Sequence, residues 1–405
     1  MDAVLDAAAA LQELATSPVA RDDPYPHYER VRGAGPAVQV SDGLLVLIGH
    51  AEVDQALRDN RLLVADVAYM DRLWPDWVEH ASMRSLSRSL LETNPPDHDR
   101  LRRLVSGVFT PRRLGHMREA IASIAGRLID TMAGGGTVDF MASFAYPLPV
   151  TVICELLGVP EADRAWFRPI AHDLTASLEP NVVDLTDADR ASDELIAYFG
   201  ELVAAKRAAP GEDLTSALVA THDGDPGVLS HEELLSNLTL LLVAGFETTA
   251  NLLGNGLRTL LERPTAMTAL RSAPQQVGAH VEEMLRYDSP VQLTSRRMLV
   301  PTVDAGHGMP ADSEVFLMVG GANRDPRRFH NPGEYDPFRA DNAPLSFGAG
   351  AHYCVGNALA RMEAQVAFPM LLDRFAGIEP AEPPVRKDRL TLRGYAEMKL
   401  SLTER

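Results

Sequence analysis

The spacing of apolar and polar residues along the chain predicts a protein built mainly from helices. Apolar residues recur at i, i+3 and i+4, the period of an amphipathic helix, over six long stretches. These are residues 98–132, 138–157, 187–208, 230–262, 274–287 and 355–376. Strand-like runs are fewer and shorter, at residues 37–40, 44–48, 291–300 and 313–318. We therefore predict a mainly α fold with a small β portion.

One segment, residues 66–96, has weak periodicity but contains Trp74 and Trp77, two of the three tryptophans. Aromatic rings in an irregular segment either fill a gap at the surface or belong to a lid over a ligand. The sequence pattern leaves both interpretations open. The length of 405 residues by itself gives a soft expectation of two or three domains.

The overall composition narrows the class of protein. With 46% hydrophobic and 23% charged residues, the chain has the composition of a globular protein. Its formal net charge of −18 repels phosphate backbones, so we expect no nucleic-acid partner. The longest mainly apolar run, residues 238–246, is shorter than the ~20 residues that span a membrane. The N-terminal segment carries Asp2 and Asp6 where a signal peptide carries basic residues, so we expect a cytoplasmic protein.

The chain has only two cysteines, Cys154 and Cys354, which excludes a disulfide scaffold. Cys354 lies in the sequence FGAGAHYCVG at residues 347–356, directly before a helical pattern that begins at Asn357. A dinucleotide-binding loop would need a third glycine where Tyr353 stands, and a preceding strand. At a helix N-terminus, unpaired N–H groups favour a thiolate and lower the pKa of the thiol. The alternative for an isolated cysteine is a small buried apolar residue.

Taken whole, residues 347–356 resemble the haem-binding signature of the cytochrome P450 family. The resemblance implies haem b as cofactor, with Cys354 as the axial metal ligand, because a thiolate ligand favours cleavage of the O–O bond. It places His352 beside a haem propionate and gives Phe347, Gly348 and Gly356 contacts with the cofactor. It also implies the cytochrome P450 fold, formed by residues 1–405 as a single domain without a fused reductase.

A second motif, VAGFETT at residues 243–249, lies in the longest helical stretch. Gly245 costs about 1 kcal/mol inside a helix, and the Thr248 hydroxyl can bond to the carbonyl of Ala244 and bend the helix. The resemblance makes Glu247 and Thr248 the catalytic acid–alcohol pair that delivers protons, and places Ala244 against the haem. The residues alone also allow an ordinary buried helix.

Haem carboxylates need cationic partners. His98 and Arg102 are one helical turn apart and share a face, and the resemblance makes them propionate partners together with Arg296. Arg297 competes with Arg296, because neighbouring side chains on a strand point to opposite faces.

Three other charged residues resemble a buried structural network of the family. Glu283 and Arg286 share one helix face, and Arg339 follows in the sequence YDPFR. We expect this trio to stabilise the fold, and to take no part in the chemistry.

The predicted function is the hydroxylation or epoxidation of a mid-sized hydrophobic molecule, using O₂ and two external electrons, in natural-product biosynthesis. No flavin or nicotinamide module is recognisable, so ferredoxin and ferredoxin reductase are the expected electron donors to a monomeric enzyme. The substrate wall is expected at Met83, Leu86, Leu241, Val243, Val291, Gln292, Leu293 and Tyr395. Alternatives are an atypical oxidation such as ring closure, desaturation or phenol coupling, a peroxide-driven reaction, and a haem-based binding or sensing protein without turnover.

Although the net charge of the whole chain is negative, one segment is basic. Residues 100–113 contain five arginines and no acid. They are Arg100, Arg102, Arg103, Arg112 and Arg113. We predict a basic docking patch for an acidic ferredoxin, and the alternative is a solvated helix end.

Overall fold

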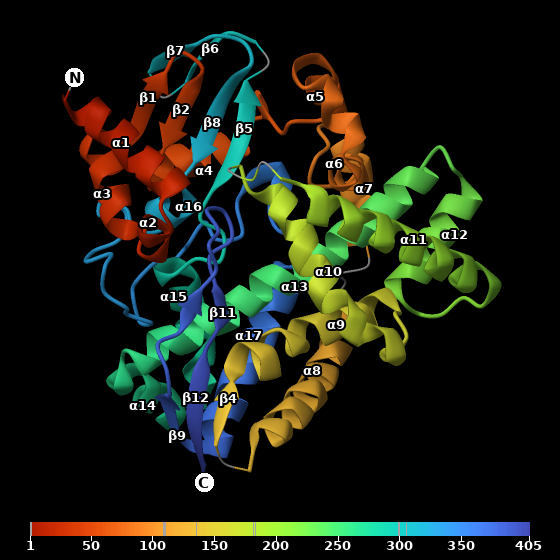
Figure 1. Cartoon of the computed structure of the whole chain (residues 1–405), viewed down its shortest axis with the longest axis vertical. Coiled ribbons are helices and arrows are strands. Elements are labelled where there is room, and N and C mark those ends of the chain that lie inside the picture. The colour runs from red at the N-terminus through yellow and green to blue at the C-terminus, as the bar shows by residue number, and fades with distance from the viewer. Residues whose placement is uncertain are drawn as a thin grey trace.

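The computed structural model describes residues 2–107, 111–134, 136–180, 182, 184–298, 300–304 and 306–405. Helices make up most of this part of the chain (Figure 1). They are α1 (Asp2–Thr16), α2 (Pro18–Asp22), α3 (Tyr25–Gly33), α4 (His50–Arg58), α5 (Val67–Leu73), α6 (Ala81–Ser87), α7 (Asp97–Ser106), α8 (Pro111–Met132), α9 (Pro147–Leu157), α10 (Phe167–Leu174), α11 (Thr186–Ala208), α12 (Leu214–Gly224), α13 (His231–Leu261), α14 (Pro264–Ser272), α15 (Val277–Tyr287), α16 (Val319–Ala322) and α17 (Asn357–Arg374).

Short 3₁₀ and π turns join several of the helices. They are η1 (Pro75–Glu79), η2 (Met141–Ala145), η3 (Glu161–Trp166), η4 (Thr175–Leu178), η5 (Pro274–Gln276) and η6 (Gly350–His352), of which η2 is a π turn. The strands are β1 (Ala37–Ser41), β2 (Leu44–Leu47), β3 (Leu62–Leu63), β4 (Thr137–Asp139), β5 (Thr294–Met298), β6 (Thr302–Asp304), β7 (His307–Met309), β8 (Ser313–Leu317), β9 (Phe375–Pro380), β10 (Val385–Arg386), β11 (Tyr395–Glu397) and β12 (Lys399–Glu404). The predicted mainly α fold with a small β portion is confirmed.

The strands of the described residues form four small sheets. The largest has the order β1-β2-β8-β5-β3 and lies beside α1 and α3, at the N-terminal end of the molecule (Figure 1). A three-stranded sheet, β4-β12-β9, lies at the opposite end, and β10-β11 and β6-β7 form two hairpins. Strand β5 pairs with β8 so that Arg297 lies opposite Glu314 and Arg296 opposite Val315. This register decides which of the two arginines points into the molecule.

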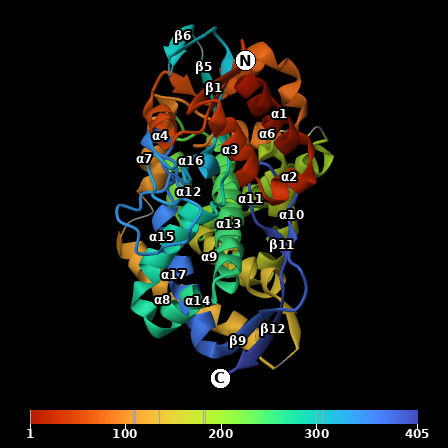
Figure 2. The ribbon, with the colours of Figure 1, turned by 90° about the vertical axis from the view of Figure 1, so that its left-hand side faces the viewer.

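Helix α13 is the central element of the fold. It is 31 residues long, and both views show it running through the middle of the molecule, with other helices around it (Figures 1 and 2). A capping box starts it: the Ser230 hydroxyl accepts the N–H of Glu233, and the Glu233 carboxylate accepts the N–H of Ser230. The helix is unbroken through Gly245, where an added Cβ would lie 3.0 Å from the side chain of Ile153. Gly245 therefore allows α13 to pack closely on α9.

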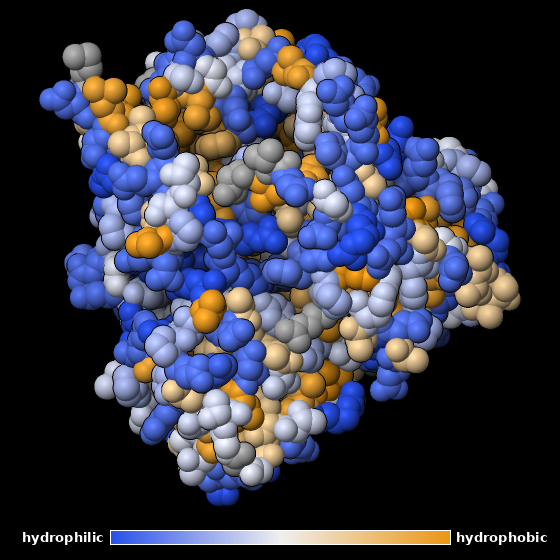
Figure 3. Space-filling model, in the orientation of Figure 1, coloured by the Kyte–Doolittle hydropathy of each residue, from blue (hydrophilic) through white to orange (hydrophobic). Residues whose placement is uncertain are grey.

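Apolar side chains are gathered mainly inside this helical body. The largest buried cluster contains residues of α8, α9, α11, α13, α15 and α17. On the face shown in Figure 3, hydrophobic residues form small separate groups among polar ones. The helical periodicity of the sequence thus corresponds to faces that pack on α13 and its neighbours.

Several predicted boundaries change in the structure. The single stretch predicted at residues 98–132 contains α7 and α8, with residues 108–110 between them outside the described part. The stretch at residues 138–157 begins with β4 and the π turn η2 before α9 starts. The short C-terminal strands β9, β11 and β12 were not predicted, because their pattern of apolar residues does not alternate over enough positions.

The segment of weak periodicity, residues 66–96, forms α5, η1 and α6. Trp77 is buried and donates its indole N–H to Asp71 at 2.8 Å, whereas Trp74 is 42% exposed. The Asp189 carboxylate of α11 accepts hydrogen bonds from the N–H and hydroxyl of Ser82, at 2.9 and 2.6 Å, and lies 2.9 Å from Nδ1 of His80. The segment is thus tied to α11 by polar contacts that its sequence does not reveal.

The charged network predicted around Glu283 is confirmed. Arg286 forms two hydrogen bonds of 2.7 Å to the Glu283 carboxylate, and both side chains are fully buried. Nε of Arg339 lies 3.6 Å from the same carboxylate. Arg286 also donates to the carbonyl oxygens of Asn323, Pro332 and Glu334. The network ties α15 to the long connection that precedes Cys354.

Replacing Arg286 by Met is expected to lower the free energy of unfolding by about 3–5 kcal/mol, because the Glu283 carboxylate stays buried without its cation. The control is Asp54→Ala, which breaks the partly exposed i, i+4 pair of Asp54 with Arg58 and should cost less than about 1 kcal/mol. Urea unfolding followed by circular dichroism measures both. An equal decrease in the free energy of unfolding for the two variants would show that the buried network does not stabilise the fold more than an exposed ion pair does.

Candidate active site

A tight turn presents Cys354 at the start of α17. The N–H of Cys354 donates to the carbonyl of Phe347 at 2.9 Å, and the Asn357 side chain donates to the carbonyl of Cys354 at 2.7 Å. Gly348 and Gly350 have φ values of 70° and 66°, in the left-handed region that favours glycine. A Cβ on Gly350 would lie only 2.3 Å from the carbonyl oxygen of Leu57. The glycines therefore let the turn approach the end of α4.

The electrostatic surroundings of the Cys354 thiol act in two directions. Burial raises its pKa, and the N–H groups of Gly356 and Asn357 and the charges of Arg102 and Arg361 lower it. The net pKa lies above that of a free thiol, so the predicted lowering by the helix N-terminus is wrong for the polypeptide alone. The rise in the thiol pKa caused by burial is larger than the lowering caused by the N–H groups of the helix N-terminus. A metal cation at the sulfur favours the thiolate and reverses this balance.

Four cationic or titratable side chains gather beside the turn. The rings of His98 and His352 have centroids 4.2 Å apart, and Arg102 donates to the carbonyl of Tyr353 at 2.6 Å. Burial, then the charges of Arg296, His98 and Arg102, lower the pKa of His352 to about 3. Nε2 of the fully buried His98 has no hydrogen-bond partner among the described residues. This arrangement attracts anionic groups.

The alternation of side chains along β5 determines which of Arg296 and Arg297 points into the molecule. Arg296 is only 6% exposed and interacts electrostatically with His98 and His352. Arg297 is on the other face of β5, where it forms an ion pair with Glu314 and lies 5.4 Å from the ring centroid of Tyr69. Arg296 is therefore the inward arginine.

The sequence analysis missed an acid near this cationic group. Burial raises the pKa of Glu92 to about 7, although the charges of Arg296 and Arg297 lower it. Glu92 is half-buried at the end of the segment with weak periodicity. Nothing in its local sequence marks it, because its partners are more than 200 residues further along the chain.

Helix α13 presents a narrow accessible face within its buried length. Ala244 is exposed and Thr248, one turn later, is half-buried, while their neighbours Val243, Phe246 and Glu247 are buried. The Thr248 hydroxyl donates to the carbonyl of Ala244 at 2.8 Å, as predicted. A buried acid thus stands next to an accessible hydroxyl on one helix.

The predicted wall residues fall into two groups. Leu86, Leu241 and Val243 lie in one buried cluster, and Met83 is half-buried on α6. Val291 forms an isolated β-bridge with Leu392.

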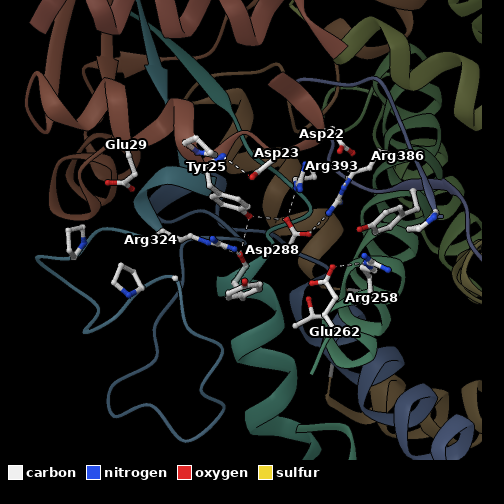
Figure 4. A pocket seen from close by; sticks show the side chains of 18 residues that line it. Asp22, Asp23, Tyr25, Glu29, Arg258, Glu262, Asp288, Arg324, Arg386 and Arg393 are labelled. Atoms are coloured by element: carbon white, nitrogen blue, oxygen red, sulfur yellow. Dashed lines mark hydrogen bonds and ion pairs between the residues drawn. The ribbon is translucent and has the colours of Figure 1, made fainter. Parts of the chain in front are cut away.

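The other wall residues are placed elsewhere. Leu293 is buried in a separate cluster with residues of α1 and α3, and the Gln292 side chain accepts from the Tyr28 hydroxyl at 2.8 Å. The Tyr395 ring lies under Arg386 at 4.1 Å. It lines a polar cavity of about 790 Å³ together with Tyr25, Asp288 and Arg386, which Figure 4 labels. These contacts occupy the three side chains, so we leave Leu293, Gln292 and Tyr395 out of the proposed wall.

The predicted basic patch is smaller than its sequence suggests. Arg100 is paired with Asp97 and Glu233 at 2.8 and 2.6 Å, so it is removed from the patch. Arg103 is exposed on α7, and the side chains of Arg112 and Arg113 lie outside the described residues. A groove of about 520 Å³, lined in part by Arg58 and Tyr353, borders the turn of Cys354.

The residues present fit a flat, anionic, metal-containing cofactor. A single accessible thiol, two left-handed glycines, and two arginines beside two imidazoles suit a planar group that carries carboxylates. Among the described residues, no group of three or more His, Cys, Asp or Glu side chains is arranged to hold a metal ion. Cys354 offers one sulfur ligand to a metal that enters within a cofactor.

Comparisons with known proteins agree with this geometry. Residues 184–394 match the family model of cytochrome P450. The chain is 40% identical to cytochrome P450 monooxygenase PikC of Streptomyces venezuelae, over 92% of this chain and 87% of that protein. It is 35% identical to 6-deoxyerythronolide B hydroxylase of Saccharopolyspora erythraea, over 94% of this chain and 96% of that protein. The chain belongs to the cytochrome P450 family and is a monooxygenase of that family, which carries haem b.

Solved structures show the same fold. The structure of P450BioI in complex with an acyl carrier protein ligated to hexadec-9Z-enoic acid superposes with a TM-score of 0.88 at 32% identity, covering 95% of this chain and 100% of that chain. The ligand-free structure of CYP164A2 from Mycobacterium smegmatis superposes with a TM-score of 0.88 at 36% identity, covering 97% of this chain and 100% of that chain. In the described part of the chain, no helix has both the length and the apolar character needed to cross a membrane.

Gly350→Ala is expected to destabilise the protein more than Gly348→Ala. Each substitution forces a left-handed φ on alanine, at a cost of about 1–2 kcal/mol. At Gly350 the new Cβ also meets the Leu57 carbonyl at 2.3 Å, whereas at Gly348 its nearest atom is 3.8 Å away. Urea unfolding of both variants, together with the haem content of the purified proteins, measures the difference. Equal stability and equal haem content would contradict the close approach at Gly350.

Proposed function

We propose that this cytochrome P450 uses O₂ and two electrons from a separate donor to hydroxylate or epoxidise a mid-sized hydrophobic molecule. The observation that carries the proposal is the pair of Glu247 and Thr248, a buried carboxylate beside an accessible hydroxyl on α13. Proton supply is what O₂ chemistry requires of the protein, whereas a protein that only binds haem ligands has no use for it. When bound, the haem supplies the chemistry that activates O₂.

Other residues of the chain are proposed to hold the haem and to leave room beside it. Cys354 is the proposed metal ligand, and the turn from Phe347 to Gly356, with Gly348, supports the ring. His98, Arg102, Arg296 and His352 are the proposed partners of the haem carboxylates, because they form the cationic group beside the turn. Ala244 leaves room on the accessible face of α13, and Thr248 places a hydroxyl there.

The substrate is proposed to be an intermediate of natural-product biosynthesis. The proposed wall is apolar and comprises Met83, Leu86, Leu241, Val243 and Val291. Among the relatives are a polyketide biosynthesis cytochrome P450, PksS of Bacillus subtilis, at 39% identity over 79% of this chain and 79% of that protein, and the 6-deoxyerythronolide B hydroxylase. An apolar wall of this kind selects substrates by shape and apolar surface.

A ferredoxin, reduced by a ferredoxin reductase, is the proposed electron donor. Arg103 is exposed on α7, and Arg102 on the same helix reaches the carbonyl of Tyr353 next to Cys354. A basic surface here brings an acidic protein close to the Cys354 turn and steers its approach.

Thr248→Ala is expected to lower the fraction of electrons recovered in product about tenfold or more, because the hydroxyl that passes protons is lost. Reduction of the protein and substrate binding should stay close to wild type, since Thr248 contacts neither Cys354 nor the cationic group. The measurement compares NADH consumed, peroxide released and product formed, with a surrogate ferredoxin and its reductase.

The same assay separates the alternatives. A peroxide-driven enzyme would turn over with hydrogen peroxide at least as fast as with ferredoxin, and Thr248→Ala would not change its yield. A sensor would show no product in either assay and unchanged ligand affinity in the variant. Either result would contradict the proposed function.

A further inference from the structure

The Glu247 carboxylate is held by a cation from a distant part of the chain. Lys387 forms an ion pair with Glu247 Oε1 across 140 residues, and the two side chains are 3% and 2% exposed. The Lys387 ammonium also donates to Oδ1 of Asn251 at 3.0 Å. Asn251 lies one helical turn after Glu247 on α13, so both acceptors are on the same face. The ammonium thus bridges two positions of the helix that carries the acid–alcohol pair.

The surroundings of the ammonium are enclosed and contain other charges. Its Nζ lies 4.8 Å from the ring centroid of Tyr146, a cation–π distance. His172 on α10 interacts electrostatically with Glu247, Lys387, Arg389 and Asp173, and its pKa is lowered mainly by burial. Among the described residues, Lys387 is thus in direct contact with the Glu247 carboxylate, and His172 belongs to a wider set of titratable groups around the pair.

The backbone that carries Lys387 is fixed independently of Glu247. The N–H of Lys387 donates to the carbonyl of Gly394 at 3.1 Å, which closes the turn between β10 and β11. The Glu179 carboxylate accepts the N–H groups of three consecutive residues in that turn, at 2.8, 2.8 and 3.1 Å. These residues are Leu390, Thr391 and Leu392. The ammonium is thus delivered to Glu247 from a preorganised turn.

The second oxygen of the carboxylate is available for chemistry. Oε2 of Glu247 is buried and has no hydrogen-bond partner among the described residues. A carboxylate held through one oxygen keeps the other free to take up a proton. A buried carboxyl that has no cation nearby takes up a proton and becomes neutral, because burial disfavours the charged form.

We propose that Lys387 is a positioning residue for Glu247, which it keeps ionised and oriented so that Oε2 can relay protons toward Thr248. The inference rests on the proposed function of Glu247 and Thr248. In the relay, Oε2 takes a proton from solvent hydronium, which leaves a neutral water, and gives the proton up on the Thr248 side, so that Glu247 returns to the carboxylate. Lys387 keeps its protons throughout and is not consumed.

The test uses the haem-loaded protein and four variants. Lys387→Met removes the charge, Lys387→Arg keeps it, and Glu247→Gln identifies the signal of the acid. The matched control is Lys399→Met, because Lys399 on β12 forms an exposed ion pair with Glu382, which follows the end of β9. Should Lys387→Met fail to fold, Lys387→Gln keeps a hydrogen bond without the charge and replaces it.

The first measurement is an infrared pH titration of the resting protein, in which the difference from Glu247→Gln isolates the Glu247 carboxyl. At pH 7 we expect a carboxylate band in the wild type, in Lys387→Arg and in Lys399→Met, and a protonated carboxyl band in Lys387→Met. A purely structural lysine would leave the ionisation of Glu247 unchanged. A carboxylate band in Lys387→Met at pH 7 would overturn the proposal.

The second measurement is turnover with ferredoxin and its reductase. Lys387→Met should lower the rate of product formation about 10- to 100-fold, shift its pH profile to higher pH and leave the spectral dissociation constant of the substrate unchanged. Lys387→Arg should recover rate and profile. If Glu247→Gln lowers the rate of product formation but Lys387→Met does not, the proposed role of Lys387 is refuted and the proposed function of Glu247 stands. If Glu247→Gln behaves as wild type, the proposed function of Glu247 fails, and the infrared result still decides whether Lys387 controls its ionisation.

Discussion

The position of one sulfur atom, that of Cys354, depends on how tightly the turn before α17 is held. The turn is closed by a hydrogen bond from the N–H of Cys354 to Phe347, and it fits against Leu57 only because residue 350 is glycine. Arg102 is anchored to the same turn through the carbonyl of Tyr353. The thiol and Arg102, one of the residues proposed to bind the haem carboxylates, are therefore fixed by the same short segment.

Buried charge is the second organising feature, and in each case it joins segments far apart in sequence. Arg286 and Glu283 tie α15 to the connection before Cys354. In the polar cavity of Figure 4, Asp288 accepts hydrogen bonds from Tyr25, Arg386 and Arg393; burial would raise its pKa, but these arginines hold it below its usual range. Because breaking such pairs strands a buried charge, they hold the frame around α13 in place.

The sequence predicts those parts of the molecule whose physical cause is local. The turn of Cys354, the bond from Thr248 to Ala244 and the alternation of Arg296 and Arg297 each follow from residues within a few positions of one another. The ion pairs of Lys387 with Glu247 and of Arg100 with Glu233 could not be predicted, because more than 130 residues separate the partners. The thiol pKa was predicted in the wrong direction because the helix N-terminus is visible in the sequence and the depth of burial is not. The contacts of Leu293 with residues of α1 and α3, and of Tyr395 with Arg386, are likewise not visible in the local sequence.

The most direct test of the account is the absorption spectrum of the reduced protein with carbon monoxide. We predict the red-shifted Soret band of a thiolate ligand in the wild type and in Cys154→Ala, since Cys154 is fully buried in the core and burial raises its pKa to about 12. The band should be absent in Cys354→Ala. A band typical of an imidazole ligand in the wild type, or a red-shifted band that persists in Cys354→Ala, would contradict the assignment of Cys354 and the site built around it.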